Sequence, residues 1–446
     1  MSNNEKQTNN ETRDSFTSKT GFILACIGSA VGMGNIWLFP YRVGQFGGAA
    51  FLIPYIIFII LLGYTGLMGE FAFGRMTQTG PIGSFKKALE TKNKKWGGIL
   101  GAIPVLGAFG IAVGYAVVVG WFLRFLVGFI TGSAMASSDS ALYFGEIAGP
   151  FGSIIWHIIA LIIVSIILVS GVAKGIEIMN KIMMPAFYIL FIIVMVRVFM
   201  LDGAIDGLKY LVVPDWAYLA EPKTWIYALG QAFFSLSLAG SGMIVYGSYL
   251  KRDVDIISSA KNTVIFDTLG AFLAGLVIIP AVFAFNLDPA SGPPLLFITI
   301  PSVFKLMPFG RLFGIIFFVS VLFASITSLM NLLEVPIEAV QSTFKLNRKV
   351  SVAIVVIAAF LLGLFAEDGD ALGMLMDFVS IYIIPLGAFI SGVMFFWVIG
   401  IKKAKSEIEC GSEKKLGKLF EISAKYVFVF LTVFVLIAGI LLGGIG

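Results

Sequence analysis

The sequence predicts an all-α, polytopic membrane protein with about eleven membrane-spanning helices. Three observations support this fold class. Hydrophobic residues make up 58% of the 446 residues and charged residues only 13%, and the mean hydropathy is +0.97. Apolar runs long enough to cross the hydrocarbon layer also recur along the whole chain. These runs are too many and too long to share one water-soluble core, so they must face lipid.

The apolar segments fall into two sets of five and a final one. The first set covers approximately residues 20–39, 49–73, 97–130, 151–170 and 176–200. The second set covers approximately residues 225–250, 256–285, 309–340, 350–365 and 374–401, and the final segment covers residues 426–442. The first segment follows a polar tail and lacks a small-residue cleavage site, so we expect it to stay in the mature protein.

The connections between segments predict the orientation in the membrane. Basic residues concentrate in alternate connections, for example Lys86 to Lys95 and Lys402 to Lys425, while acidic residues dominate the others. By the positive-inside rule we expect a multi-pass plasma-membrane protein with a cytoplasmic N-terminus and an external C-terminus. The expected divisions are a cytoplasmic tail (1–19), a first five-helix repeat (20–200), an extracellular connection (201–224), a second repeat (225–401), a cytoplasmic loop (402–425), and an eleventh helix with a short external C-terminus (426–446).

The composition also excludes several kinds of function. The basic residues are scattered over short connections rather than gathered on one face, so we expect no nucleic-acid partner. Cys26 and Cys410 imply no disulfide framework. His157 is the only histidine and has no Cys, Asp or Glu cluster beside it, and no Ser/His or paired-aspartate arrangement supports an intramembrane enzyme.

Two glycine-containing segments suggest where a ligand binds. "GSAVGMGN" (28–35) lies within the first apolar segment and "SLSLAGSGM" (235–243) within the sixth. Small residues in membrane helices often serve only for close helix packing. These two, however, open the two sets of five, as expected of an inverted five-plus-five repeat with discontinuous helices 1 and 6. Backbone that leaves helical geometry inside a bilayer must line a cavity or bind something, so the breaks predict a ligand site.

Four motifs resemble those of a known family. They are "GNIWLFPY" (34–41), "GGAAFLIPY" (47–55), "GQAFFSLSL" (230–238) and "ASITSLMNLLE" (324–334). Their order and spacing resemble the neurotransmitter:sodium symporters, whose bacterial members include a leucine transporter. The resemblance extends over residues 13–397 and implies a sodium-driven carrier that imports an L-amino acid by alternating access. A monomer is expected to suffice.

The resemblance implies two sodium ions. One site would use the carbonyl groups of Gly28, Val31 and Ala324 with the hydroxyl groups of Thr327 and Ser328. In the alternative interpretation, the two hydroxyl groups simply bond back to their own helix.

The other sodium site would use Ala30, Asn35, Ser235 and Asp267 together with the substrate carboxylate. The leucine transporter has an asparagine where Asp267 aligns, so this site carries an additional acid. A carboxylate at mid-membrane costs roughly 2.5–3.5 kcal/mol unless it is paired.

Asp267 also bears on chloride. Tyr55, Gln231 and Ser235 match positions that surround chloride in chloride-dependent members of the family. Ala271, one turn after Asp267, replaces the serine of those members. We therefore hypothesise that Asp267 supplies the negative charge itself and that no chloride is required.

The resemblance also implies a substrate pocket. Tyr115 would hydrogen-bond the substrate carboxylate, with the amides near Gly32 and Gly34 at a half-helix end completing an anion site. Gly32 replaces the aspartate of the monoamine carriers, which favours an ordinary α-amino acid. The remaining pocket residues would be Ala30, Ile111, Phe234, Ser235, Ser237, Gly240, Ser328 and Leu332. Gly240 stands where the leucine transporter has a phenylalanine, so we expect a bulky hydrophobic or aromatic side chain.

The gates depart from the family pattern. Asp377 matches the outer-gate acid, but the usual arginine is replaced by Leu38, and Arg42 lies one turn later. At the inner gate Arg13 and Phe16 match the family, whereas the aligned acid is Ser342. The nearest acid is Glu338, one turn away.

Glu70 matches an acid on the second helix that supports the broken sixth helix.

Two rival functions stay open. A related carrier could be driven by protons with Asp267 as the proton site, and an ion channel would carry currents far above the substrate flux.

Overall fold

The computed structural model describes residues 14–238, 241–290 and 295–445. Within these residues eight helices are long and apolar enough to span a membrane, and a bent pair forms a ninth. The two remaining predicted spans are the shorter helix α9 and the interrupted pair α13 and α14. All eleven predicted segments therefore coincide with helical elements, and the chain is a helical membrane protein.

The first five spans follow the predicted ranges closely. Their elements are α1 (Lys19–Ala30) with η1 (Gly34–Leu38) and α2 (Phe39–Gln45); α3 (Ala49–Phe58), η2 (Ile59–Gly63) and α4 (Tyr64–Thr77); α6 (Gly97–Thr131); α9 (Ile154–Val169); and η3 (Val172–Glu177) with α10 (Ile178–Phe199). The segments η1, η2 and η3 are π-helical turns, which often lie at functional places in a helix.

The second set contains the longest helices. Its elements are α13 (Pro222–Ser235) and α14 (Gly242–Ser248); α15 (Ile256–Ala284); α17 (Gly310–Phe344); α18 (Arg348–Gly363) with η5 (Leu364–Ala366); and α19 (Gly369–Phe378), η6 (Val379–Ile383), α20 (Ile384–Gly392) and η7 (Val393–Gly400). The last span consists of α22 (Lys418–Ile422), η8 (Ser423–Phe428) and α23 (Val429–Leu442).

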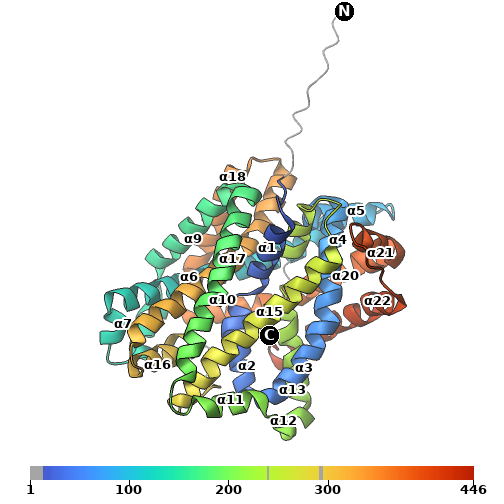
Figure 1. Cartoon of the computed structure of the whole chain (residues 1–446). Coiled ribbons are helices and arrows are strands. Elements are labelled where there is room, and N and C mark those ends of the chain that lie inside the picture. Colours follow the sequence, from blue (N-terminus) through green and yellow to red (C-terminus); the bar gives the residue numbers. More distant parts are fainter. Residues whose placement is uncertain (1–13, 239–240, 291–294, 446) are drawn as a thin grey trace, which may run out of the picture.

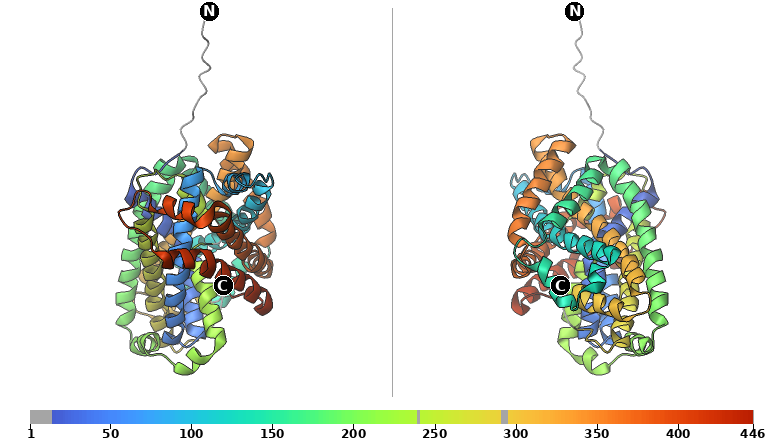
Figure 2. Two further views of the ribbon diagram at one scale, coloured as in Figure 1. Left: turned by 90° about the vertical axis from the view of Figure 1, so that its right-hand side faces the viewer. Right: turned by 90° about the vertical axis from the view of Figure 1, so that its left-hand side faces the viewer.

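The connections lie at opposite ends of the bundle. Helices α11 (Ala204–Val212) and α12 (Trp216–Ala220) lie at the lower end in Figures 1 and 2, while the start of α18 lies at the upper end. The Lys-containing helix α5 (Pro81–Glu90) lies toward the upper end, and α16 (Ile300–Leu306) toward the lower end (Figure 1). The expected loop at 402–425 is largely helical, because α21 (Ile401–Glu409) and α22 occupy most of it.

A buried polar cluster fixes the turn between α18 and α19. Glu367 accepts hydrogen bonds from the Ser153 amide, at 3.0 Å, and from the Ser153 hydroxyl group. Its other oxygen lies 2.9 Å from Nδ1 of His157, and both side chains are buried. The histidine therefore packs against a carboxylate. The described residues contain no group of three or more metal-ligating side chains.

The two broken helices lie at the centre of the bundle. Helix α1 packs against α10, α15 and α17, and α14 packs against α4 and α17. Helix α17 also packs along α6 and α10. The interruptions predicted from the glycines are thus surrounded by the longest helices, which shield their backbone groups from lipid.

Candidate functional site

The first span is interrupted at the predicted place. Helix α1 ends at Ala30, Val31 is extended with ψ 104°, and η1 begins at Gly34. The two halves are bent by 52°. The break turns the carbonyl groups of Gly28, Ser29 and Val31 toward α17, where the Ser328 hydroxyl group lies 3.2, 3.1 and 3.3 Å from them.

The second predicted break carries left-handed residues on both sides. Ser237 has φ +51° and Ser241 has φ +52°, a conformation that non-glycine residues seldom adopt. The Ser237 hydroxyl group donates to the Ser29 carbonyl at 3.0 Å, which joins the two breaks directly. The predicted pocket residue Gly240 lies outside the described residues.

The five residues predicted for one sodium site come together. Ser328 joins the carbonyl groups of Gly28 and Val31, and Thr327 packs against Gly28, where a Cβ atom would lie 2.8 Å from Thr327 Cβ. The 2.9 Å contact of the Thr327 hydroxyl group with the Ala324 carbonyl lies within α17. All five residues are buried. Three carbonyl groups and two hydroxyl groups make a neutral all-oxygen set, which suits a hard monovalent cation such as sodium. Thr327 also bonds to its own helix, as the alternative interpretation required.

The polar side chains predicted for the other sodium site also converge. The Asn35 amide donates to Asp267 Oδ1 at 2.8 Å and to Ser235 Oγ at 3.1 Å. Ser235 donates to Asp267 Oδ2 at 2.8 Å, and Tyr55 donates to Ser235 at 3.3 Å. Asp267 is fully buried. The fourth predicted residue, Ala30, lies in the wall of the adjoining cavity.

A cavity of about 60 Å³ is lined by residues from both breaks. Its walls include the predicted residues Ala30, Gly32, Gly34, Ile111, Tyr115, Phe234, Ser237, Ser328 and Leu332, and also Ser29, Met33, Gly242, Asn331 and Ile384, which sequence reasoning missed. Ser235 lies behind the wall rather than in it. In this conformation a bulky side chain requires the walls to move apart.

One end of the cavity is polar. The Met33 amide donates to the Tyr115 hydroxyl oxygen at 3.0 Å, and a Cβ atom on Gly32 would lie 2.5 Å from that oxygen and 2.4 Å from the Ser328 hydroxyl oxygen. A side chain at position 32 would therefore fill this end. Hydroxyl groups next to the amides of a half-helix can hold a small anionic group.

Two predicted supporting residues lie behind the breaks. The Gln231 amide donates to the Gly34 carbonyl at 2.8 Å, which ties α13 to η1. Glu70 is buried on α4 beside the backbone of Met243 and Ile244, at the start of α14. This location fits the predicted role of Glu70 at the broken sixth helix.

The structure does not bring the two outer-gate candidates together. Arg42 donates to Gln45 at 2.9 Å and lies over the Tyr227 ring, 4.4 Å from its centroid. Asp377 is exposed on α19 and forms no ion pair with the described residues. The guanidinium group is thus engaged by a cation–π contact rather than by Asp377.

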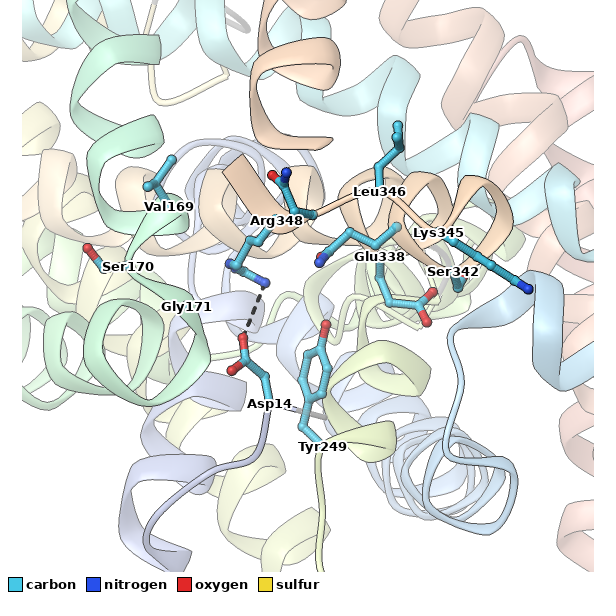
Figure 3. A pocket seen from close by; sticks show the side chains of 12 residues that line it. Asp14, Val169, Ser170, Gly171, Tyr249, Glu338, Ser342, Lys345, Leu346 and Arg348 are labelled. Atoms are coloured by element: carbon cyan, nitrogen blue, oxygen red, sulfur yellow. Dashed lines mark ion pairs between the residues drawn. The ribbon is translucent and has the colours of Figure 1, made fainter. Parts of the chain in front are cut away.

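The end of the bundle at which α18 starts contains a larger cavity of about 740 Å³, shown in Figure 3. Arg348 forms two hydrogen bonds to Glu334, at 3.0 and 2.7 Å, and lies 3.6 Å from Asp14. Tyr249 also donates to Glu334, at 2.7 Å. These charges join the start of the described chain to α17 and α18, and the motif comparison missed them.

The predicted inner-gate residues lie around this cavity. Phe16 is buried and packs edge-on against Phe22 and Tyr246. Glu338 lines the cavity and accepts the Gly80 amide at 2.8 Å. Arg13 lies outside the described residues.

A second contact at this end of the bundle was also missed by the sequence analysis. Glu177, buried in η3, accepts the Thr17 amide at 2.7 Å, the Thr17 hydroxyl group at 2.8 Å and the Ser18 hydroxyl group at 2.7 Å. Gly21 permits this approach, because a Cβ atom there would lie 2.1 Å from Glu177 Oε1. We call Glu177, Thr17 and Ser18 the α1 clamp.

Comparisons with known proteins agree with this geometry. The model of the sodium:neurotransmitter symporter family matches residues 13–144 and 138–442. The uncharacterized sodium-dependent transporter YhdH of Bacillus subtilis is 36% identical over 431 residues, covering 93% of this chain and 94% of that protein. An uncharacterized sodium-dependent transporter of Methanocaldococcus jannaschii, MJ1319, is 33% identical over 430 residues, covering 91% and 86%.

A solved structure also matches over nearly the whole chain. The crystal structure of MhsT in complex with L-phenylalanine has a TM-score of 0.86 and 34% sequence identity, covering 96% of this chain and 99% of that one. The relatives are membrane transporters rather than enzymes. With two broken helices around a central cavity and this extent of similarity, the chain belongs to the sodium:neurotransmitter symporter family.

Proposed function

We propose that this transporter imports a bulky hydrophobic or aromatic L-amino acid together with two sodium ions, by alternating access and without chloride. One observation carries the proposal. Ser328 lines the central cavity and also bonds the carbonyl groups of Gly28 and Val31, so one hydroxyl group joins the substrate space to an all-oxygen ion site.

The cavity walls support an amino-acid substrate. Tyr115 and the amides near Gly32 and Gly34 would bind the carboxylate, while Ile111, Phe234 and Leu332 offer an apolar surface to the side chain. MhsT, which is similar over nearly the whole chain, holds L-phenylalanine in its crystal structure. We also propose that five residues act in the gates: Arg13, Phe16 and Glu338 at one end, and Arg42 and Asp377 at the other.

The driving force is adequate for accumulation. Each sodium ion that moves down 100 mV supplies about 2.3 kcal/mol, so two ions supply about 4.6 kcal/mol. At about 1.4 kcal/mol per tenfold, this supports more than a thousandfold accumulation of a neutral amino acid.

The test is uptake of radiolabelled L-phenylalanine into proteoliposomes with and without an inward sodium gradient. We expect gradient-dependent uptake that Thr327→Ala and Asp267→Asn reduce severely. Competition by a panel of amino acids should favour bulky apolar side chains. A preference for glycine or alanine would contradict the proposed substrate class.

Chloride independence rests on Asp267. This carboxylate lies among Asn35, Ser235 and Tyr55 and supplies a fixed negative charge beside the sodium ligands. Replacing external chloride with gluconate should leave uptake unchanged, and a large loss would refute this part of the proposal.

A proton-driven carrier is the second candidate. Asp267 is fully buried, and none of the ion pairs formed by the described residues includes it, so it can exchange a proton as the site opens and closes. Uptake at fixed pH separates the two mechanisms, because only the sodium carrier stops when sodium is replaced by choline.

The orientation is part of the proposal as well. The distribution of Lys and Arg supports a plasma-membrane protein with a cytoplasmic N-terminus and an external C-terminus. A monomer is proposed to suffice. Protease accessibility of a tag at each terminus in right-side-out vesicles would test the orientation.

A further inference from the structure

The side chain of Asn180 places a polar atom beside the break in the first span. Asn180 lies on α10, and its side chain is fully buried. Its Nδ2 atom donates to the Ile176 carbonyl group at 2.8 Å, whereas its Oδ1 atom has no hydrogen-bond partner among the residues that the structure describes. Buried polar atoms are normally paired, so this unpaired acceptor calls for an explanation.

The chemistry of the amide determines which of its atoms faces α1. Turning the carboxamide over would place Oδ1 of Asn180 against the Ile176 carbonyl group, and two acceptors repel each other. The Nδ2 atom therefore stays with Ile176, and the oxygen atom faces α1.

Gly28 shows where this oxygen atom lies. A Cβ atom on Gly28 would lie 2.0 Å from Asn180 Oδ1 and 2.8 Å from Thr327 Cβ. Asn180 from α10 and Thr327 from α17 therefore approach the same side of Gly28. Gly28 and Thr327 are two of the five residues proposed for one sodium site, so the unpaired oxygen atom adjoins that site.

The three neighbours that these distances identify offer the amide oxygen no strong donor. Gly28 presents a hydrogen on carbon, which makes only a weak bond. Met184 Sδ lies 2.8 Å from the same Cβ position and is an acceptor. The Thr327 hydroxyl group donates within its own helix, to the Ala324 carbonyl group at 2.9 Å. A group of acceptors without a free donor suits a cation.

We propose that Asn180 Oδ1 is a further oxygen ligand of this sodium site, so that α10 holds the ion together with α1 and α17. The inference rests on the sodium site of the proposed function. A neutral amide oxygen is a hard ligand of the same kind as the three carbonyl groups, so it binds sodium without adding a charge. Ligation also explains why the protein supplies this oxygen atom with no donor of its own.

The test measures saturable binding of radioactive sodium to the purified full-length protein by scintillation proximity, without substrate. Asn180→Ala removes the oxygen atom, so the sodium concentration for half-maximal binding should rise roughly five- to tenfold, the effect of one lost polar interaction. Asn180→Asp keeps an oxygen atom at the same position and should bind sodium at least as tightly as the wild type.

Ser320→Ala is the matched control. Ser320 is fully buried on α17, and its hydroxyl group bonds the Ile316 carbonyl group of its own helix at 2.6 Å. Removing this hydroxyl group also deletes a buried bond to the preceding turn, but it should leave the sodium concentration for half-maximal binding unchanged.

Thermal unfolding separates ion binding from packing. A ligand that binds only the folded protein raises its unfolding midpoint, so the rise in sodium relative to choline reports binding in each variant separately. At the same sodium concentration, this rise should be smaller in Asn180→Ala than in the wild type, whatever the midpoint of either protein in choline.

The possible outcomes separate the inference from the function on which it rests. Equal sodium concentrations for half-maximal binding in the wild type and in Asn180→Ala overturn the assignment. An Asn180→Asp protein that binds sodium as weakly as Asn180→Ala also overturns it, as does an unchanged sodium-induced rise in the midpoint of Asn180→Ala. In these cases sodium-driven uptake by the wild type still supports the proposed function. If the wild type shows neither saturable sodium binding nor sodium-driven uptake, the proposed function itself has failed.

Discussion

The α1 clamp should control how readily the first helix leaves its site. Glu177→Gln keeps the side-chain shape but at best leaves three neutral hydrogen bonds, because its single amide oxygen accepts the Thr17 amide while its NH2 group donates to the Thr17 and Ser18 hydroxyl groups. A bond to a charged group contributes about 1 kcal/mol more than a neutral one, so the upper estimate of the loss is about 3 kcal/mol. Thr17 is exposed, and water will offset about half of that loss.

The remaining 1.5 kcal/mol or so corresponds to a roughly tenfold larger population with α1 detached. Cys26 reports on that population, because it lies on α1 and is fully buried. In a Cys410→Ser background, we expect Glu177→Gln to react with N-ethylmaleimide about ten times faster than the parent protein.

Lys181→Ala provides the matched control. Lys181 also binds Glu177, at 2.7 Å, but it comes from α10 rather than α1 and its side chain is 38% exposed. Removing the partly exposed Lys181 side chain leaves all three α1 bonds to Glu177 in place, so it should change the labelling rate far less. Equal labelling rates in the parent and in a folded Glu177→Gln protein would refute the clamp.

Three further predictions concern the cavity, the ion site and the scaffold. Gly32→Ala should abolish substrate binding, measured by scintillation proximity, because its methyl group would overlap two hydroxyl groups, whereas Gly145→Ala has no atom within 4 Å and should bind normally. Thr327→Ala should raise the sodium concentration for half-maximal uptake by roughly tenfold, the effect of about 1.4 kcal/mol. Thr268→Ala removes a hydroxyl group that bonds its own helix at 2.8 Å, and it should leave that sodium concentration unchanged. Glu367→Ala should cost about 3–5 kcal/mol by leaving its buried partners unpaired, and a thermal-unfolding midpoint close to that of the wild type would contradict the structural role of Glu367.

The sequence predicted the broken helices because their glycines and hydroxyl groups lie close together in short motifs. Gly28 and Ser328 belong to separate motifs, yet each motif resembled a family whose members bring them together. Asp267 lies outside these motifs and was recognised because the leucine transporter has an asparagine at the aligned position. Local pattern and resemblance therefore predicted most of the cavity and both ion clusters.

Other contacts depend on pairs that no local pattern joins. Glu177 meets Thr17 across 160 residues, and Glu367 meets His157 across 210. A single acid in an apolar segment signals that a partner exists, because an unpaired buried charge is costly, but it does not say which helix supplies that partner. Asn331 lies inside the motif 324–334, but nothing in the local sequence indicates that it lines the cavity together with Ser328.

The double engagement of Ser328 has a consequence for redesign. This hydroxyl group belongs to the proposed sodium site and to the cavity wall at once, so on that proposal substrate specificity and sodium coupling cannot be altered independently at that position. Asn331 and Leu332 lie one turn further along the same helix and line the cavity, but they are not among the residues proposed to bind sodium. To change the substrate while keeping the sodium coupling, one would substitute residues of that turn and of the cavity walls that face it.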